Sequence, residues 1–553
     1  MRNGAIPLSR RIAATQAGRP PRQIKLHLLQ LRWSSTTVGS RSWSTPLAKT
    51  IAEAIEATGP ISIAAYMRQC LTSPQGGYYT TTRAETSSDQ FGSKGDFITS
   101  PEICQVFGEL VAIWFVTEWM AQGRRRGGVQ LIEVGPGRGT LMDDMLRTIA
   151  TFKELAASIE GVYLVEAGDG LREKQRRVLC GDNQEMVKTQ MGWRCVSRYE
   201  GIPVFWVQDI NLLPKDEEKA KMPFIIAHEF FDALPIHAFE SQHPASETEA
   251  KTSSSLVDSA GKRLLAPTRR STSTSVPSSS STTPRTNNQW RELLVTPTPK
   301  PSSASPLSTQ AEIDSTPEFQ LALSKTSTRS SLLLPESSPR YQALKSQAGS
   351  SIEISPDSLR YIADFARRIG GEKRAPNNVN RSERTTTPIT SPPPGSKISS
   401  GAALIIDYGP SSTVPLNSLR GIKNHKRVSP FSEPGLVDLS ADVDFTALAE
   451  GAVQASGGVE VWGPVEQGDF LGALGGAERV GMLIQGLEKG VDVGRSGRGG
   501  GLEEKKRVLM GSWKRLVEKG GGGMGRIYKV LAILPEAGGK RVPVGFGGGV
   551  EGS

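Results

Sequence analysis

Residues 129–149 read VQLIEVGPGRGTLMDDMLRTI, and this stretch contains the main signal for the fold. A strand-like segment, Val129 to Val134, leads into glycines at 135, 137 and 139, and a segment with helical spacing follows. Glycines allow a tight turn and let a ligand approach the backbone. The stretch therefore predicts a buried strand, a glycine turn and a helix whose first turn faces a ligand.

Strands and helices alternate on the carboxyl-terminal side of this unit. Helical patterns separate the first three of five predicted strands. The strands are expected at 129–135, 161–167, 204–210, 223–230 and 401–409. This alternation is typical of a parallel sheet with helices on both faces, so we predict a Rossmann-like α/β fold.

The glycine spacing indicates the class of cofactor. A dinucleotide fingerprint, G-x-G-x-x-G, would need a glycine at the position of Thr140. The pattern E-x-G-x-G-x-G, which runs from Glu133 to Gly139 through Gly135 and Gly137, is instead typical of class I S-adenosylmethionine methyltransferases. A purely structural strand-to-helix turn is the alternative.

Acidic residues end the second and third predicted strands. Glu166 is expected to accept the ribose hydroxyls, and Asp209 to meet the adenine amino group. Each could instead be a solvated strand end or a helix cap. The carboxyl ends of parallel strands form the usual ligand edge of such sheets, so we predict S-adenosyl-L-methionine as the cofactor there.

The fourth strand ends in HEFFDALP, residues 228–235. Two carboxylates can hold a guanidinium by paired hydrogen bonds and orient one of its nitrogens. We therefore predict that Glu229 and Asp232 hold the methyl acceptor and that His228 accepts a proton; the residues themselves do not identify the acceptor, and an arginine side chain is what the family resemblance given below implies. The alternative is that Asp232 caps a helix and that His228 is a core residue.

Composition narrows the partners and the compartment. The chain has 553 residues and a net charge of +10, but residues 1–45 are rich in Arg, Ser and Thr and contain no acid. That composition is typical of a mitochondrial transit peptide, so the basic charge does not indicate a nucleic-acid partner. No apolar run is long enough for a membrane span, and the four cysteines and five histidines show no metal-ligand spacing.

The same patterns divide the chain into segments. Within the N-terminal helical cap, a helix is expected over about 100–122. Further helices are expected at 436–450 and 467–518, and a late strand is expected at 526–534. The expected segments are a transit peptide (1–45), an N-terminal helical cap with a substrate loop (46–125), the first part of the core (126–240), mostly disordered insertions with ordered islands at 289–295 and 352–371 (241–400), the second part of the core with a C-terminal helical subdomain (401–535) and a flexible tail (536–553).

Several of these segments together resemble one family. GSKGDFITSPEI, LIEVGPGRGTL, IAHEFFDALP, LIIDYG and DLSADVDF are similar to the MidA-type methyltransferases. The resemblance implies a mitochondrial matrix protein arginine methyltransferase that forms symmetric dimethylarginine on a core subunit of complex I, iron–sulfur protein 2, and supports assembly of that complex. It also implies a substrate loop that closes over the cofactor through Gly92, Gly95, Asp96, Thr99 and Glu102. A small-molecule methyltransferase and a non-catalytic assembly scaffold are the alternatives, and the oligomeric state is left open.

Overall fold

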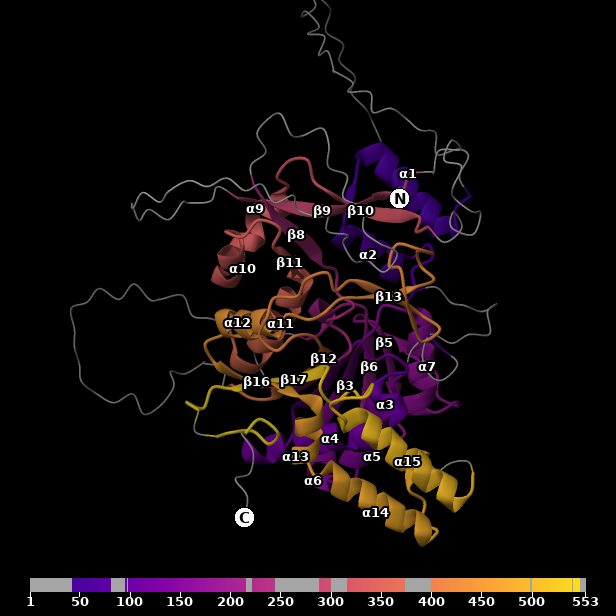
Figure 1. The fold of residues 1–553 in the computed structure, drawn as a ribbon. Coiled ribbons are helices and arrows are strands. Elements are labelled where there is room, and N and C mark those ends of the chain that lie inside the picture. The colour runs from indigo at the N-terminus through magenta and orange to yellow at the C-terminus, as the bar shows by residue number, and fades with distance from the viewer. Residues whose placement is uncertain are drawn as a thin grey trace, which may run out of the picture. The chain divides into compact units, whose positions relative to one another are not determined.

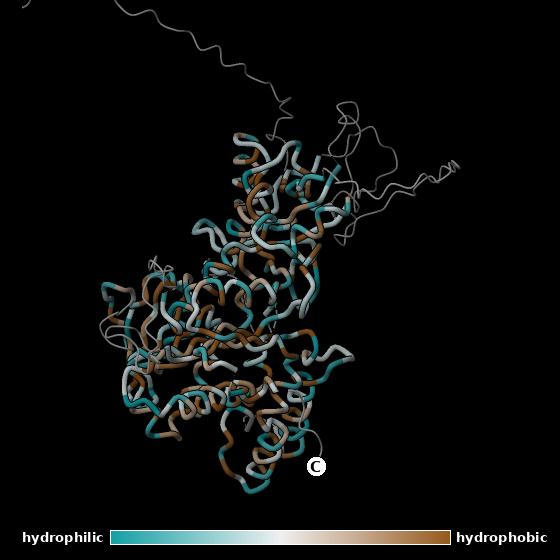
Figure 2. Tube along the Cα trace, turned by 90° about the vertical axis from the view of Figure 1, so that its left-hand side faces the viewer, coloured by the Kyte–Doolittle hydropathy of each residue, from teal (hydrophilic) through white to brown (hydrophobic). Residues whose placement is uncertain are grey.

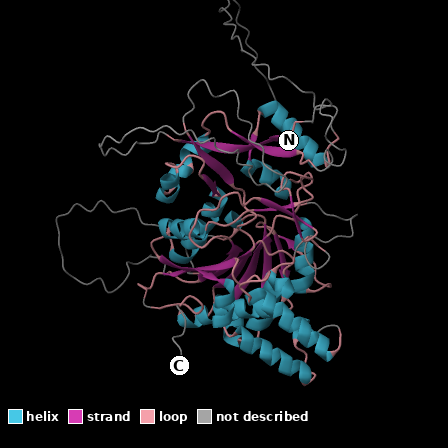
Figure 3. Cartoon of the chain, in the orientation of Figure 1, coloured by secondary structure: helices cyan, strands magenta, loops and turns pink. Residues whose placement is uncertain are grey.

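The structure is a computed structural model of the chain. It describes residues 42–80, 95–96, 98–214, 221–243, 288–299, 316–372, 399–497, 500–539 and 541–547. The predicted transit peptide, residues 1–45, therefore lies almost wholly outside the described residues. The helices and strands of the described part are shown in Figure 1 and, coloured by type, in Figure 3.

Nine strands form the main sheet in the order β16-β17-β12-β7-β2-β3-β6-β5-β4. The five strands from β12 to β6 are parallel, while β17 and β16 at one edge and β5 and β4 at the other pair antiparallel. All five predicted parallel strands are present. The bounds are β2 (Val129–Val134), β3 (Ile159–Val165), β4 (Val187–Lys188), β5 (Trp193–Val196), β6 (Pro203–Val207), β7 (Met222–His228), β12 (Ala402–Tyr408), β16 (Val459–Glu466) and β17 (Tyr528–Pro535).

The direction in which the chain winds reverses at β2. It runs from β2 through β3 to β6 on one side, and then crosses to β7 and β12 on the other. Ligands of open α/β sheets bind at such a switch point, in the crevice outside the carboxyl ends of the strands. The topology therefore places the expected site where β2 and β7 end.

Helices cover both faces of this sheet (Figure 3). Neighbouring residues of β7 alternate between the two cores: Ile225 packs with α11 and α12, and Ile226 packs with α4 and α5. Both are fully buried, as the continuous apolar run predicts. These helices and the shorter ones near them are α4 (Gln105–Ala121), α5 (Thr140–Ile149), α6 (Lys153–Ser158), α7 (Asp169–Cys180), η2 (Ile210–Leu212), α11 (Pro356–Gly370), α12 (Phe445–Ala455), α13 (Gln467–Ala473), α14 (Gly476–Glu488), η4 (Gly494–Gly497) and α15 (Leu502–Val517).

Two smaller sheets accompany the main one. A five-stranded antiparallel sheet joins β1, β9, β8 and β11 in that order, with β10 paired to β9, and a three-stranded sheet has the order β14-β13-β15. A separate hydrophobic core joins α1 and α2 to these sheets. The bounds are α1 (Pro46–Thr58), β1 (Ile61–Ser62), α2 (Ile63–Thr72), α3 (Ser100–Ile103), β8 (His237–Gln242), β9 (Gln289–Pro297), β10 (Phe319–Leu323), α9 (Arg329–Leu333), η3 (Pro335–Ser337), α10 (Pro339–Leu344), β11 (Ser351–Ile354), β13 (Arg420–Lys423), β14 (Lys426–Val428) and β15 (Asp438–Ser440).

The predicted insertion 241–400 needs correction. The ordered islands at 289–295 and 352–371 form β9, β11 and α11, but residues 319–344 are also folded, as β10, α9, η3 and α10. Phe319 is 1% exposed and stacks on Trp43 at 5.5 Å between ring centroids. This segment is stabilised by pairing with β9, a contact that its Ser-rich composition does not reveal. The stretches 244–287, 300–315 and 373–398 lie outside the described residues.

Three further predictions are wrong in part. The helix expected over 100–122 is interrupted at Cys104, whose extended backbone separates α3 from α4. The segment 436–450 contains β15 before α12 begins at Phe445. The tail 536–553 is packed in part, because Phe546 is 9% exposed and contacts Phe470 at 5.6 Å between ring centroids.

Hydropathy follows this arrangement. In Figure 2, hydrophobic residues run along the strands in the interior and hydrophilic residues follow the outer turns. Among the helices that the structure describes, none has the length and apolar character to span a membrane.

Candidate active site

A cavity of about 190 Å³ lies at the carboxyl ends of β2 and β7. The glycine turn, the end of β3 and the turn after β7 form one side of it, and α2, the segment after α2, and α3 contribute to its wall. Eight of the predicted site residues line this cavity: Glu133, Gly135, Gly137, Glu166, His228, Glu229, Thr99 and Glu102. The topological switch point and the predicted residues therefore coincide.

The glycine turn has the backbone that only glycine adopts readily. The φ angles of Gly135, Gly137 and Gly139 are +67°, +52° and +83°, all in the left-handed region. A Cβ added to Gly135 would lie 2.7 Å from the ring of Phe230, so the turn also packs directly on the segment after β7. Gly139 precedes the first residue of α5 and does not line the cavity.

Two carboxylates stand beside the glycine turn. Burial raises the pKa of Glu133 to about 8, and its Oε2 is buried with no hydrogen-bond partner in the described part of the protein. Burial also raises the pKa of Glu166, to about 7, although the Gly168 N–H and the Gln175 amide donate to it. An unpaired buried acceptor is costly without a ligand. Acceptors on both sides of a glycine turn fit a molecule with hydroxyl and ammonium groups, as S-adenosyl-L-methionine has.

Asp209 does not take the predicted position. It ends β6 but caps η2, where its Oδ1 accepts hydrogen bonds from the backbone N–H and the side-chain amide of Asn211. Its other oxygen lies 3.8 Å from Arg360, and the residue is not part of the cavity wall. The helix-cap alternative describes it correctly, because an amide donor two residues on competes for the carboxylate.

The turn after β7 is held in a strained conformation. Glu229 has φ of +48°, which is unusual for a residue with a side chain, and its N–H donates to the Ile406 carbonyl at 3.0 Å. The buried carboxylate of Asp407 accepts from the backbone N–H groups of Phe230, Phe231 and Asp232, at 3.1, 2.9 and 3.3 Å. Asp407 therefore fixes the direction in which the Glu229 side chain leaves the turn.

Glu229 combines burial with a few polar partners. Tyr528 Oη donates to its Oε1 at 3.1 Å, and His228 Nε2 lies 3.3 Å from the same oxygen without making a hydrogen bond. Burial, and secondly the charge of Asp232, raises the pKa of Glu229 to about 8. No lysine or arginine forms an ion pair with it in the described part of the chain.

His228 is poorly suited to the predicted role of proton acceptor. Its ring packs against Phe107 at 4.9 Å between centroids, and burial lowers its pKa to about 3. A base is most effective when its pKa lies near the working pH. Glu229 meets that condition better, so it is the better candidate for proton acceptor.

Asp232 does not line the cavity. Its Oδ2 accepts from the Tyr408 hydroxyl, and its Oδ1 is buried without a hydrogen-bond partner among the described residues. Burial raises its pKa, and Arg420, stacked 4.5 Å from the Tyr408 ring, partly offsets this. The structure therefore brings Glu229 but not Asp232 to the cavity.

The predicted substrate loop is only partly at the cavity. Thr99 and Glu102 line it, and Glu102 lies 3.4 Å from Arg138 of the glycine turn. Asp96 instead accepts from the Tyr78 hydroxyl at 2.7 Å and the Asn424 N–H at 2.8 Å. Gly95 does not line the cavity either, and Gly92 lies outside the described residues.

Two buried acids, Glu109 and Asp144, form ion pairs with arginines close to α3. Arg147 bridges Glu109 and Asp144, at 2.8 Å to each, and Arg479 adds a contact to Glu109 at 2.6 Å. Arg495 contacts Asp144 at 2.6 Å and donates to the carbonyl of Pro101, a cavity residue. Arg495 thereby links the C-terminal helical region to α3, the short helix that contributes to the cavity wall.

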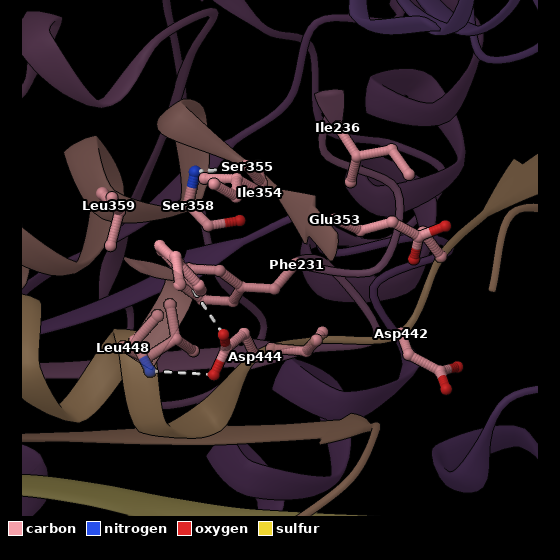
Figure 4. A pocket seen from close by; sticks show the side chains of 14 residues that line it. Phe231, Ile236, Glu353, Ile354, Ser355, Ser358, Leu359, Asp442, Asp444 and Leu448 are labelled. Carbon is pink, nitrogen blue, oxygen red and sulfur yellow. Dashed lines mark hydrogen bonds between the residues drawn. The ribbon is translucent and has the colours of Figure 1, made fainter. Parts of the chain in front are cut away.

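A second cavity, next to Phe231 of the turn after β7, is too small for a cofactor. It has a volume of about 30 Å³ and is lined by Phe231, Ile236, Glu353, Ser355 and Asp444, among others (Figure 4). That volume suits one or two water molecules. The larger cavity is therefore the candidate active site.

The sequence left several residues of the site unidentified. Asp407 had a visible signal, an acid at the end of an apolar run, and it stands in the LIIDYG segment. Tyr79 and Tyr528 reach the site from segments remote in the sequence, and Gln175 stands in a helix rich in Arg and Lys. Only the tertiary structure shows that these side chains meet at one place.

Comparison with known proteins gives consistent matches. The family described as "Putative S-adenosyl-L-methionine-dependent methyltransferase" matches residues 110–465. A Danio rerio protein named protein arginine methyltransferase NDUFAF7, mitochondrial, is 30% identical over 464 residues, which cover 84% of each chain. Its Drosophila melanogaster homolog is 31% identical over 88% of this chain and 85% of its own, and the Homo sapiens protein is 29% identical over 80% and 76%.

The fold also matches a solved structure. A Burkholderia thailandensis protein crystallised with S-adenosyl-homocysteine superposes with a TM-score of 0.54 at 19% identity. The match covers 91% of this chain and 93% of that one. At that identity the likeness bears on the fold alone, which agrees with the predicted methyltransferase sheet.

Proposed function

Because the chain belongs to this family of S-adenosyl-L-methionine-dependent methyltransferases, we propose that it methylates arginine side chains of a protein substrate. The cofactor is S-adenosyl-L-methionine, which supplies an electrophilic methyl group. Glu133, Gly135, Gly137 and Glu166 would hold it, since they line the cavity and include the unpaired acceptor. The relatives named above are called protein arginine methyltransferases, which supports the choice of acceptor.

The observation that carries this proposal is the environment of Glu229. A carboxyl group whose side chain is only 10% exposed, with a tyrosine as its donor and no lysine or arginine paired to it in the described part of the chain, is open to pairing with a cationic ligand. A guanidinium is always charged and donates in a plane, so it pairs well with a carboxylate. It would favour the ionised form of Glu229, which then orients one nitrogen toward the methyl group and accepts its proton.

We further propose the finer specificity that the MidA-type resemblance implies. The acceptor would be iron–sulfur protein 2 of complex I, the product symmetric dimethylarginine, and the purpose assembly of that complex. Mass spectrometry of arginine methylation on iron–sulfur protein 2, with and without this protein, tests the acceptor and the product, and the amount of assembled complex I tests the purpose. Loss of one symmetric dimethylarginine is expected. An unchanged methylation pattern in a strain with intact complex I would refute the choice of substrate.

We propose a mitochondrial location on two grounds. The relatives are named mitochondrial, and residues 1–45 have the composition of a transit peptide. The matrix is the compartment that follows from the proposed substrate. N-terminal sequencing of protein isolated from mitochondria should begin near residues 33–47, and a retained Met1 would contradict removal of the segment.

A further inference from the structure

Gln175 on α7 is a buried side chain that nothing in the proposed chemistry uses. It is 0% exposed and its amide makes three hydrogen bonds. Nε2 donates to Glu166 Oε2 at 2.9 Å and to the Gly137 carbonyl at 2.8 Å, while Oε1 accepts from Trp206 Nε1 at 2.9 Å. One amide therefore joins the end of β3, the glycine turn and β6.

The orientation of this amide is fixed by chemistry. An indole N–H can only donate, so the amide oxygen must face Trp206. The two N–H bonds must then point toward Glu166 and Gly137, and a flipped amide would leave three groups without partners. Trp206 is 0% exposed on β6, which pairs with β3 on one side and β5 on the other, and this anchors the arrangement.

Both groups that receive these hydrogen bonds belong to the cofactor cavity. Glu166 has a second oxygen bound by the Gly168 N–H at 2.7 Å, so its carboxylate plane is set by two donors from opposite sides. The glycine turn also packs directly on Gln175. A Cβ added to Gly139 would lie 3.3 Å from Gln175, which is a tight contact. The helix thus packs on the turn with no intervening side chain.

We propose that Gln175 is a positioning residue for the cofactor: it holds Glu166 and the glycine turn in the geometry that binds the nucleoside and the amino-acid part together. Gln175 does not line the cavity, so it acts through these two groups. The inference concerns cofactor binding only and does not depend on which acceptor is methylated.

Isothermal titration of the full-length protein with S-adenosylhomocysteine tests the proposal. Gln175→Leu removes all three hydrogen bonds at similar volume, and we expect binding about tenfold weaker, equivalent to about 1.4 kcal/mol. Gln467→Leu is the matched control, because Gln467 is also 0% exposed and donates to the Leu516 carbonyl, remote from the cavity. It is expected to lower the melting temperature without changing the affinity. Equal affinities of Gln175→Leu and wild type would overturn the proposal.

The isosteric Gln175→Glu variant gives a second test that does not require tolerance of leucine. The new carboxylate still accepts from Trp206 but cannot donate once ionised. The titratable groups around it are Glu166, directly after β3, and, on α7, Arg172 with its partner Asp169. The glycine turn carries Arg138, which pairs with Glu102, and Trp206 adds no titratable group. Two ionised carboxylates repel each other. The ratio of variant to wild-type dissociation constants should therefore grow between about pH 6 and pH 9, and a constant ratio would contradict the assignment.

A double-mutant cycle separates positioning from general stability. If Gln175 acts by orienting Glu166, then Gln175→Leu should cost much less affinity in a Glu166→Gln background than in the wild type. Full additivity of the two losses would show that Gln175 only stabilises the fold.

Discussion

Replacement of Glu229 by glutamine separates a catalytic carboxylate from a structural one. The amide keeps the size of the side chain and can still accept from Tyr528, but it cannot become an anion. If the anion orients the guanidinium in the transition state, turnover should fall by about 10²–10³, roughly 2.7–4 kcal/mol, by analogy with the loss of one oxyanion-hole donor. The dissociation constant of S-adenosylhomocysteine should change little.

The same variant should become more stable at alkaline pH. Burial and Asp232 raise the pKa of Glu229 from 4.5 to about 8. Each tenfold step in that equilibrium is worth about 1.4 kcal/mol, so ionising Glu229 in the folded protein costs on the order of 5 kcal/mol more than in the unfolded chain. Between pH 4.5 and about 8 the folded state holds a proton that the unfolded state releases, so wild-type stability falls as the pH rises through this window.

Melting temperature and methyl incorporation should therefore be measured on the same preparations. Glu229→Gln should melt several degrees above the wild type near pH 8.5, with the difference vanishing near pH 4.5. Glu353→Gln is the matched control: Glu353, on β11, is 5% exposed, its pKa is raised by burial, and it accepts from the backbone N–H of Ser418. It should show a stability change without loss of turnover. Near-normal turnover of Glu229→Gln would refute the catalytic assignment.

Three other changes test the cavity and the fold. Gly137→Val, at a φ of +52°, should abolish S-adenosylhomocysteine binding in calorimetry while circular dichroism stays native; retained affinity would exclude this turn as the site. Asp407→Asn weakens the acceptor of three backbone N–H groups in the turn after β7. Turnover should fall by about 10–100-fold, while the affinity for S-adenosylhomocysteine stays unchanged. Equal losses of turnover and affinity would contradict a role of Asp407 in placing Glu229. Deletion of 319–345 should lower the melting temperature by about 10 °C because it removes buried Phe319 and Tyr341. Deletion of 250–280, of similar length and outside the described residues, is its control and should cost less, since loop length changes closure by only ~0.6 kcal/mol per doubling.

The parallel sheet and the glycine turn could be predicted from sequence because local physics dictates both. A strand buried on two faces is mostly apolar, as β7 is, and left-handed backbone favours glycine, as in the turn after β2. The cavity residues that follow directly from these elements, such as Glu133 and Glu229, were predicted for the same reason.

Side chains whose direction depends on a neighbour could not be assigned that way. Asp209 and Glu166 both follow buried strands, yet Asn211 binds the first to its own turn, while Gln175 and Gly168 direct the second to the cavity. Asp232 was expected to face the ligand together with Glu229, but only Glu229 lines the cavity, while Asp232 accepts a hydrogen bond from Tyr408. Spacing alone cannot predict that outcome, because Asp407, far along the chain, sets the turn.

Burial of acids at this sheet edge has a consequence for binding. Burial raises the pKa of Glu133 and of Glu229 to about 8, and that of Glu166 to about 7, so each carboxyl group keeps its proton to a higher pH than an exposed carboxyl group does. A cationic ligand favours their ionised forms and must release those protons as it binds. Neutral ligands gain nothing from this exchange. The cost of burying three acids therefore makes the cavity selective for positively charged groups, a property that both S-adenosyl-L-methionine and an arginine side chain possess.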